Sequence, residues 1–221
     1  MKHKRARAAA RPQPDSRLAL ALLLLFSLLL LAAAPARAGT CLEEIVQAEK
    51  DYKIPRGMLL AVSLVETGAS GTPVAYALNV KGRAVMAKTE LDAAKHLRDA
   101  KGNLRSNVFA GCMQLSVSHH KKAFTPVERI VNPAENVRYA AKYLLRLRTE
   151  TGSWGAAVAR YNGGTGKTAM AYQCKVRSRL VGLGAGDSAA LIDGKRCPSD
   201  DPAAVSPKTR RTFQEAQVPV G

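Results

Sequence analysis

The apolar residues of the middle of the chain recur with helical spacing. Residues 41–52 carry theirs on one side, which predicts a short amphipathic helix. Residues 54–68 are apolar almost throughout, with proline in the first turn and Gly68 as a stop. A helix that is apolar on all sides is normally buried. We therefore expect this segment to be the central helix of the domain.

Later segments are also patterned as helices, and their ends carry caps or glycine stops: 89–100, 132–151, 153–161 and 168–180. The clearest start is Asn132-Pro133-Ala134-Glu135, which combines a cap, a first-turn proline and a glutamate three residues after the cap. Residues 76–80 and 83–86 flank Lys81-Gly82 and predict a small β-hairpin.

Composition changes near the end of the chain. Glycine, proline, serine, aspartate and alanine dominate from Gly182 onward. Such a composition rarely supports a packed core, so we expect residues 182–221 to be a flexible tail. The pattern thus predicts a mainly α domain over residues 39–181 with a small β-hairpin.

The N-terminal segment has the pattern of an export signal. Six Lys/Arg residues precede an apolar run over 18–34, and a small-x-small site ends at Ala38. We predict a secretory signal peptide over 1–38 and a periplasmic location. Because the apolar run has 17 residues, an uncleaved inner-membrane anchor facing the periplasm is the alternative. Cys41 suggests lipidation, but Thr40 before it fits a lipidation motif poorly, so we reject that interpretation.

The chain of 221 residues carries a net charge of +17. The first 38 residues contain seven Lys/Arg and one Asp, which gives them a net charge of +6. The remaining residues contain 27 Lys/Arg and 16 Asp/Glu, which gives them a net charge of +11. Such a protein is attracted to polyanions, including nucleic acids, anionic membranes and acidic cell-wall polymers. Export separates it from nucleic acid, so we expect no nucleic-acid partner, and membrane contact only if the signal is uncleaved.

Cysteine usage agrees with export. Cys41, Cys112, Cys174 and Cys197 form an even set, which in an oxidising compartment favours disulfides. Three pairings are open. Because no pair has CxxC spacing, we expect neither a metal site nor a redox motif.

Glu66 is the candidate for acid–base chemistry. It lies in the last turn of the apolar helix, where the negative end of the helix dipole and the apolar neighbours both favour the protonated carboxyl. A carboxylic acid that is neutral near pH 7 is suited to general acid catalysis. The alternative is an exposed glutamate that merely ends the helix.

Other polar residues have simpler explanations. Glu90, Asp92 and Glu135 lie where helix caps are expected. His119 and His120 are adjacent and cannot share a helix face, which favours a surface or packing role. Residues 163–168 resemble a phosphate-binding loop, but Tyr161 occupies the position of its first glycine, so we reject that interpretation.

Four motifs, in order, resemble those of the soluble lytic transglycosylase (SLT) family. Together they cover residues 42–176. Ala61–Gly68 resembles the family's helix that ends in Glu-Ser-Gly, and Gly111–Leu115 resembles its Gly-Leu-Met-Gln-Ile motif. Asn132–Leu144 resembles the third motif of the family, and Ala159–Gly164 resembles its Ala-Tyr-Asn-x-Gly motif. The resemblance implies a lysozyme-like fold of the goose-type/SLT class.

The resemblance also implies an activity. It is cleavage of the β-1,4 bond between N-acetylmuramic acid and N-acetylglucosamine in peptidoglycan, with formation of a 1,6-anhydro end and no cofactor. Glu66 would serve as acid and then as base. Five further residues would contact sugar or line the cleft: Gln114, Tyr161, Ser63, Asn162 and Met113.

Residues 78–83 and Cys112 resemble those of a small branch of the family that works with secretion, pilus or conjugation machinery. A member of this branch would open the cell wall locally so that the machinery can pass through it. Thr67 in place of serine, Gly163, and Phe109 where that branch often has an acidic residue are departures. Two alternatives stay open: a hydrolytic muramidase, which needs a second carboxylate, and a non-catalytic wall-binding assembly protein.

Overall fold

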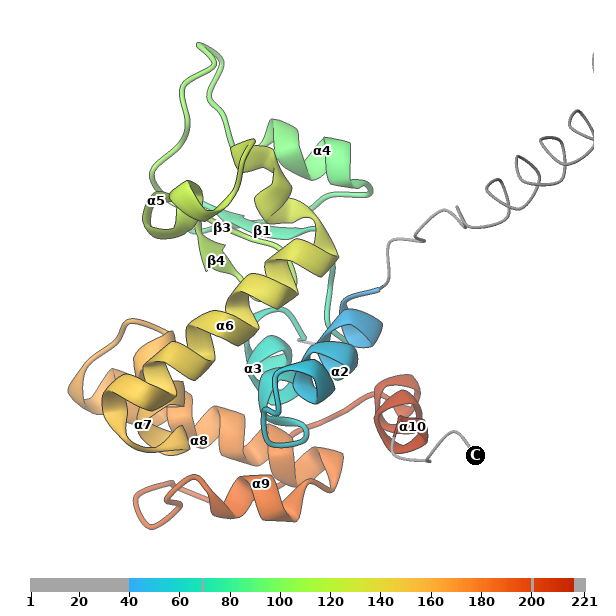
Figure 1. Ribbon diagram of the computed structural model, residues 1–221, viewed down its shortest axis with the longest axis vertical. Helices are drawn as coiled ribbons and strands as arrows, with labels where there is room; N and C mark the ends of the chain where they lie inside the picture. The colour runs from blue at the N-terminus through green and yellow to red at the C-terminus, as the bar shows by residue number, and fades with distance from the viewer. Residues whose placement is uncertain (1–39, 69, 200, 217–221) are drawn as a thin grey trace, which may run out of the picture. The chain divides into compact units, whose positions relative to one another are not determined.

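The computed structural model describes residues 40–68, 70–199 and 201–216 (Figure 1). These described residues all lie in one compact unit. The predicted signal peptide lies outside the described residues. No helix within the described ranges is long and apolar enough to cross a membrane.

Helices make up most of this unit, which confirms the predicted mainly α class. The α-helices are α2 (Cys41–Asp51), α3 (Met58–Glu66), α4 (Glu90–Lys95), α5 (Val117–His120), α6 (Pro133–Thr151), α7 (Trp154–Tyr161), α8 (Gly166–Leu183), α9 (Gly186–Ala190) and α10 (Pro207–Glu215). Short 3-10 turns, η1 (Lys121–Ala123) and η2 (Val127–Val131), join α5 to α6.

A small antiparallel sheet stands beside the helices. Its strands are β1 (Ala77–Val80), β2 (Arg83–Met86), β3 (Val108–Ala110) and β4 (Leu115–Ser116), in the order β2-β1-β3-β4. The predicted hairpin is confirmed, with Leu78 opposite Val85. On its other side Leu78 pairs with Ala110 of β3. Strands β3 and β4 have three and two residues, too short to show an alternating pattern.

The central helix α3 is shorter than predicted but buried as expected. Its residues from Met58 to Leu64 are all buried. Gly57 precedes it with a φ of 82°, which interrupts helical backbone and moves the start to Met58. The carboxylate of Glu49 on α2 accepts the N–H groups of Gly57 (2.7 Å) and Leu60 (2.9 Å), and so caps α3 from a neighbouring helix.

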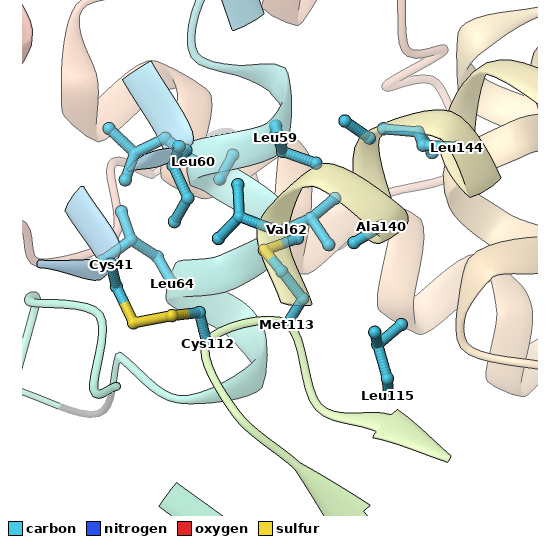
Figure 2. Packing of buried hydrophobic residues seen from close by; sticks show 14 of the residues in the cluster. Cys41, Leu59, Leu60, Val62, Leu64, Cys112, Met113, Leu115, Ala140 and Leu144 are labelled. Atoms are coloured by element: carbon cyan, nitrogen blue, oxygen red, sulfur yellow. A yellow bond between two sulfur atoms is a disulfide. The ribbon is translucent and has the colours of Figure 1, made fainter. Parts of the chain in front are cut away.

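Helix α6 is the longest of the described helices and extends from the side of the sheet to the side of α7 and α8 (Figure 1). The Asn132 side chain accepts the N–H of Glu135, which confirms the predicted cap. Ala140 and Leu144 of α6 pack with Leu59 and Val62 of α3 in the core (Figure 2). By contrast α4 ends at Lys95 rather than near residue 100, because the chain turns back so that Arg98 can pair with Leu104.

The expectation of a flexible tail from Gly182 is wrong for the described residues. Helix α8 continues to Leu183, and α9 and α10 follow on the same unit. Phe213 is 2% exposed, and the Arg56 guanidinium lies 3.7 Å from its ring centre. Ser206 N–H donates to the Gly71 carbonyl. The domain therefore does not end at residue 181. Its last part is held by a few widely spaced apolar residues, which the overall composition of this segment does not reveal.

Two disulfides join Cys41 to Cys112 and Cys174 to Cys197, which selects one of the three pairings. The first ties the start of α2 to the loop before β4 (Figure 2). Since the Cys41 sulfur is used in this bond and the residue is buried, it is not available to carry a lipid.

Candidate active site

A cleft of about 620 Å³ lies between the sheet, the end of α3 and the helices α6 and α7. Residues from several separate segments line it: Glu66, Phe109, Gln114, Leu115, Ser116, His119, His120, Tyr139, Tyr143, Arg146, Tyr161, Asn162 and Gly163. Four of the six residues that the sequence singled out for the site are in this set.

Glu66 lies at the inner end of the cleft, as the last residue of α3. Its Oε1 accepts a hydrogen bond of 2.6 Å from the hydroxyl of Tyr172 on α8. Burial raises the pKa of Glu66 from the ordinary value of 4.5 to about 7, and the hydrogen bond from Tyr172 partly opposes this shift. The carboxyl is thus neutral in a large fraction of molecules at pH 7, as its place in the apolar helix led us to expect.

The loop from Gly111 to Gln114, called the floor loop below, brings Gln114 to the cleft. Asn136, buried on α6, holds it by accepting the Met113 N–H (2.9 Å) and donating to the Ala110 carbonyl (2.9 Å). Gly111 has a φ of 78°, and a side chain there would meet Asn136 Nδ2 at 2.5 Å. Glycine is therefore required at this position.

Gln114 follows this tight turn and lies at the cleft with a φ of 46°. Its Nε2 donates to the carbonyls of Ala77 (2.9 Å) and Gly111 (3.1 Å), which fixes the orientation of the amide.

Tyr161 and Asn162 reach the cleft from the end of α7. The Tyr161 hydroxyl donates to the Met113 carbonyl at 3.0 Å, so it braces the floor loop while its ring lines the cleft. Burial raises the pKa of Tyr161, and the nearby charge of Glu66 adds to this effect. Asn162 is exposed at the rim, where its amide is accessible to a ligand.

The expected sugar contacts of Ser63 and Met113 are wrong. Both residues are 0% exposed. Ser63 lies one helical turn before Glu66, but its side chain faces the floor loop rather than the cleft. Its Oγ donates a hydrogen bond of 2.8 Å to the Cys112 carbonyl. The Met113 side chain points into the core beside Val62 (Figure 2). Their role is to position the floor loop.

Several cleft residues were not found from the sequence. Tyr139 and Tyr143 lie one turn apart on α6 with nearly parallel rings, 6.5 Å between centroids, and the Tyr139 hydroxyl is 2.9 Å from His120 Nδ1. Their four-residue spacing on a predicted helix could have revealed this wall. For Tyr172, 106 residues after Glu66, the sequence offers no comparable signal.

The part of the chain that the structure describes shows neither a second carboxylate in the cleft lining nor a cluster of metal ligands. Among the described residues that line the cleft, Glu66 supplies the only carboxylate. Glu49 also has a pKa raised by burial to about 7, but its backbone contacts place it at the opposite end of α3, ~13 Å along the axis. Within the described ranges, no group of three or more His, Cys, Asp or Glu residues could hold a metal ion.

Comparison with known proteins agrees with this geometry. The family model of the transglycosylase SLT domain matches residues 43–176. Searches of curated proteins and of solved structures found no match. The matched range is more than half of the chain and contains every cleft residue together with Tyr172. The chain therefore belongs to the transglycosylase SLT family, whose domain is mainly α and lysozyme-like.

Proposed function

We propose that this protein is a lytic transglycosylase that cleaves the β-1,4 bond between N-acetylmuramic acid and N-acetylglucosamine, with Glu66 as its acid and base. Membership of the SLT family supports action on peptidoglycan in general terms. The observation that carries the finer proposal is that one carboxylate, with a pKa of about 7, is found among the described residues that line the cleft.

One carboxylate with this pKa suits the two steps of an intramolecular transfer. The protonated Glu66 gives its proton to the glycosidic oxygen as the bond from that oxygen to C1 of the muramic acid breaks. The resulting carboxylate takes the proton of the C6 hydroxyl of the same sugar as O6 bonds to C1. The products are a new 4-hydroxyl and a 1,6-anhydro ring, with no water consumed and Glu66 protonated again.

A hydrolytic enzyme generally uses a second carboxylate as nucleophile or base. The described cleft lining offers none, which favours the intramolecular route. A pKa near the working pH lets one group act efficiently in both directions. In this proposal Gln114 and Asn162, which line the cleft, bind acetamido and hydroxyl groups, and the rings of Phe109 and Tyr161 contact the sugars.

The direct test is digestion of purified peptidoglycan, with mass analysis of the released muropeptides. Glu66→Gln preserves shape and an acceptor for Tyr172 but cannot transfer a proton. Glu49→Gln is the control, because it makes the same change in a second glutamate whose pKa desolvation raises but which does not line the cleft. Circular dichroism checks that each variant is folded.

We expect anhydro ends, lighter than reducing ends by one water, from the wild type and Glu49→Gln but not from Glu66→Gln. Reducing ends would instead identify a hydrolytic muramidase. Intact binding without cleavage by the wild type would identify a wall-binding assembly protein.

We also propose that the protein works in the periplasm, where it opens the wall for a secretion, pilus or conjugation apparatus. The two disulfides support an oxidising compartment. N-terminal sequencing of the protein from the periplasmic fraction tests the location, with Gly39 expected as the first residue. Recovery of the intact N-terminus in the inner-membrane fraction would favour the anchored alternative.

A further inference from the structure

One wall of the cleft is built by a single face of α6. Tyr139, Tyr143 and Arg146 lie at successive helical spacings and all line the cleft. The Arg146 guanidinium lies 5.0 Å from the centre of the Tyr143 ring, a cation–π distance. The Tyr143 and Tyr161 rings are 5.5 Å apart, so two aromatic rings lead from Arg146 toward the part of the cleft where Glu66 lies.

Arg146 is only weakly engaged by its neighbours. In the described part of the chain its ionic contact is with Glu150, at 3.6 Å, and the two side chains are 61% and 43% exposed. Such an exposed pair within one helix contributes little energy. A guanidinium has five N–H donors in a planar fork, so donors are accessible to a ligand carboxylate that approaches from the cleft.

The positive charge acts on the cleft wall. Burial raises the pKa of Tyr139, and the charge of the nearby Arg146 guanidinium partly opposes that shift. Glu66 is the only carboxylate among the described lining residues and is neutral in much of the population at pH 7. Arg146 is the only Arg or Lys among those described residues, so it gives its part of the cleft a positive charge, which Glu150 on the same helix offsets in part.

The glycan strand itself offers Arg146 little to bind. Its sugars carry hydroxyl and acetamido groups, and where a stem peptide is attached the lactyl carboxyl of muramic acid is an amide. The free carboxylates of the polymer belong to the stem peptides. An extended peptide spans about 3.4 Å per residue, so a few residues reach across the two aromatic rings from a muramic acid at Glu66.

We propose that Arg146 binds a stem-peptide carboxylate and makes the protein selective for strands whose peptides carry free carboxylates. This inference rests on the proposed function, since it takes the cleaved polymer to be peptidoglycan. Stacking on Tyr143 orients the guanidinium plane, and the carboxylate replaces or joins the exposed Glu150 in a charge-assisted pair. Arg146 is thus a specificity residue and takes no part in proton transfer.

A matched pair of substrates tests this proposal. The first is a muropeptide tetrasaccharide with free stem-peptide carboxylates, and the second is the same molecule with those groups converted to carboxamides. We expect amidation to lower kcat/KM of the wild type about tenfold, through KM, the usual effect of one charge-assisted hydrogen bond. Arg146→Ala should cleave both substrates at the rate at which the wild type cleaves the amidated one.

The control is Arg138→Ala, which removes the same charge from an exposed position of α6 that does not line the cleft. It should retain the wild-type preference, and Arg146→Lys should show an intermediate one because it keeps the charge but not the planar fork. A wild type that does not distinguish the substrates, or an Arg146→Ala variant that is slowed equally on both, would overturn the proposal.

Failure of the proposed function would look different. In that case neither substrate would yield anhydro ends from the wild type. The affinities of Glu66→Gln for the two substrates, with and without Arg146→Ala, still test the role of Arg146. A loss of affinity on amidation that disappears with Arg146→Ala supports it, and equal affinities refute it.

Discussion

Replacing Glu66 by glutamine should abolish activity and at the same time stabilise the protein at alkaline pH. The buried carboxyl has a pKa of about 7 in the folded chain and about 4.5 when exposed. Between these values the folded state binds more protons than the unfolded state, so rising pH lowers the free energy of unfolding. The contribution of Glu66 is fully present below pH 4.5 and is lost as pH rises through 7.

The size of the effect follows from the shift. A difference of about 2.5 pKa units corresponds to about 3 kcal/mol of unfolding free energy above pH 8. Glutamine occupies the same volume, still accepts from the Tyr172 hydroxyl and does not ionise. Glu66→Gln should therefore match the wild type near pH 4.5 and exceed its stability by about 3 kcal/mol at pH 8.

Urea unfolding of both proteins at pH 4.5, 6, 7 and 8 measures this difference. Glu49 titrates in the same window, but it is present in both proteins and cancels in the comparison. A stability difference that does not change with pH would refute the reasoning, as would a wild type more stable than Glu66→Gln at pH 8. Either result would mean that Glu66 is not held in a desolvated site.

Three other changes test separate parts of the structure. Tyr172→Phe removes a hydrogen bond that lowers the pKa of Glu66, so the alkaline limb of the kcat/KM profile should move to higher pH; an unchanged limb would contradict the contact. Replacing Cys41 and Cys112 by serine opens a loop of 71 residues and should cost about 4 kcal/mol in urea unfolding, whereas no loss would indicate another pairing. Phe213→Ala should cost about 3–5 kcal/mol by thermal or urea unfolding, and a neutral effect would restore the flexible-tail interpretation.

The sequence by itself determined the parts of the protein that depend on near neighbours. Helix α6 begins at the predicted Asn132 cap and ends at Thr151, as its pattern over 132–151 predicts, because caps act within a single turn. The apolar helix placed Glu66 in its last turn and favoured a raised pKa, but the alternative of an exposed glutamate stayed open until the structure showed the burial that raises this pKa. The four motifs in order were sufficient to indicate the family that the match over 43–176 shows.

Only the tertiary structure decided which surfaces face one another. Ser63 and Met113 lie within the motifs, yet they are buried because that side of α3 and the floor loop pack together. Tyr172 reaches Glu66 from 106 residues away, and the pairing of Cys41 with Cys112 spans 71. Phe213 anchors a segment of polar composition by packing beside Gly57. These contacts depend on how whole helices dock, since the energy of burial is shared across the interface and is not a property of either segment alone.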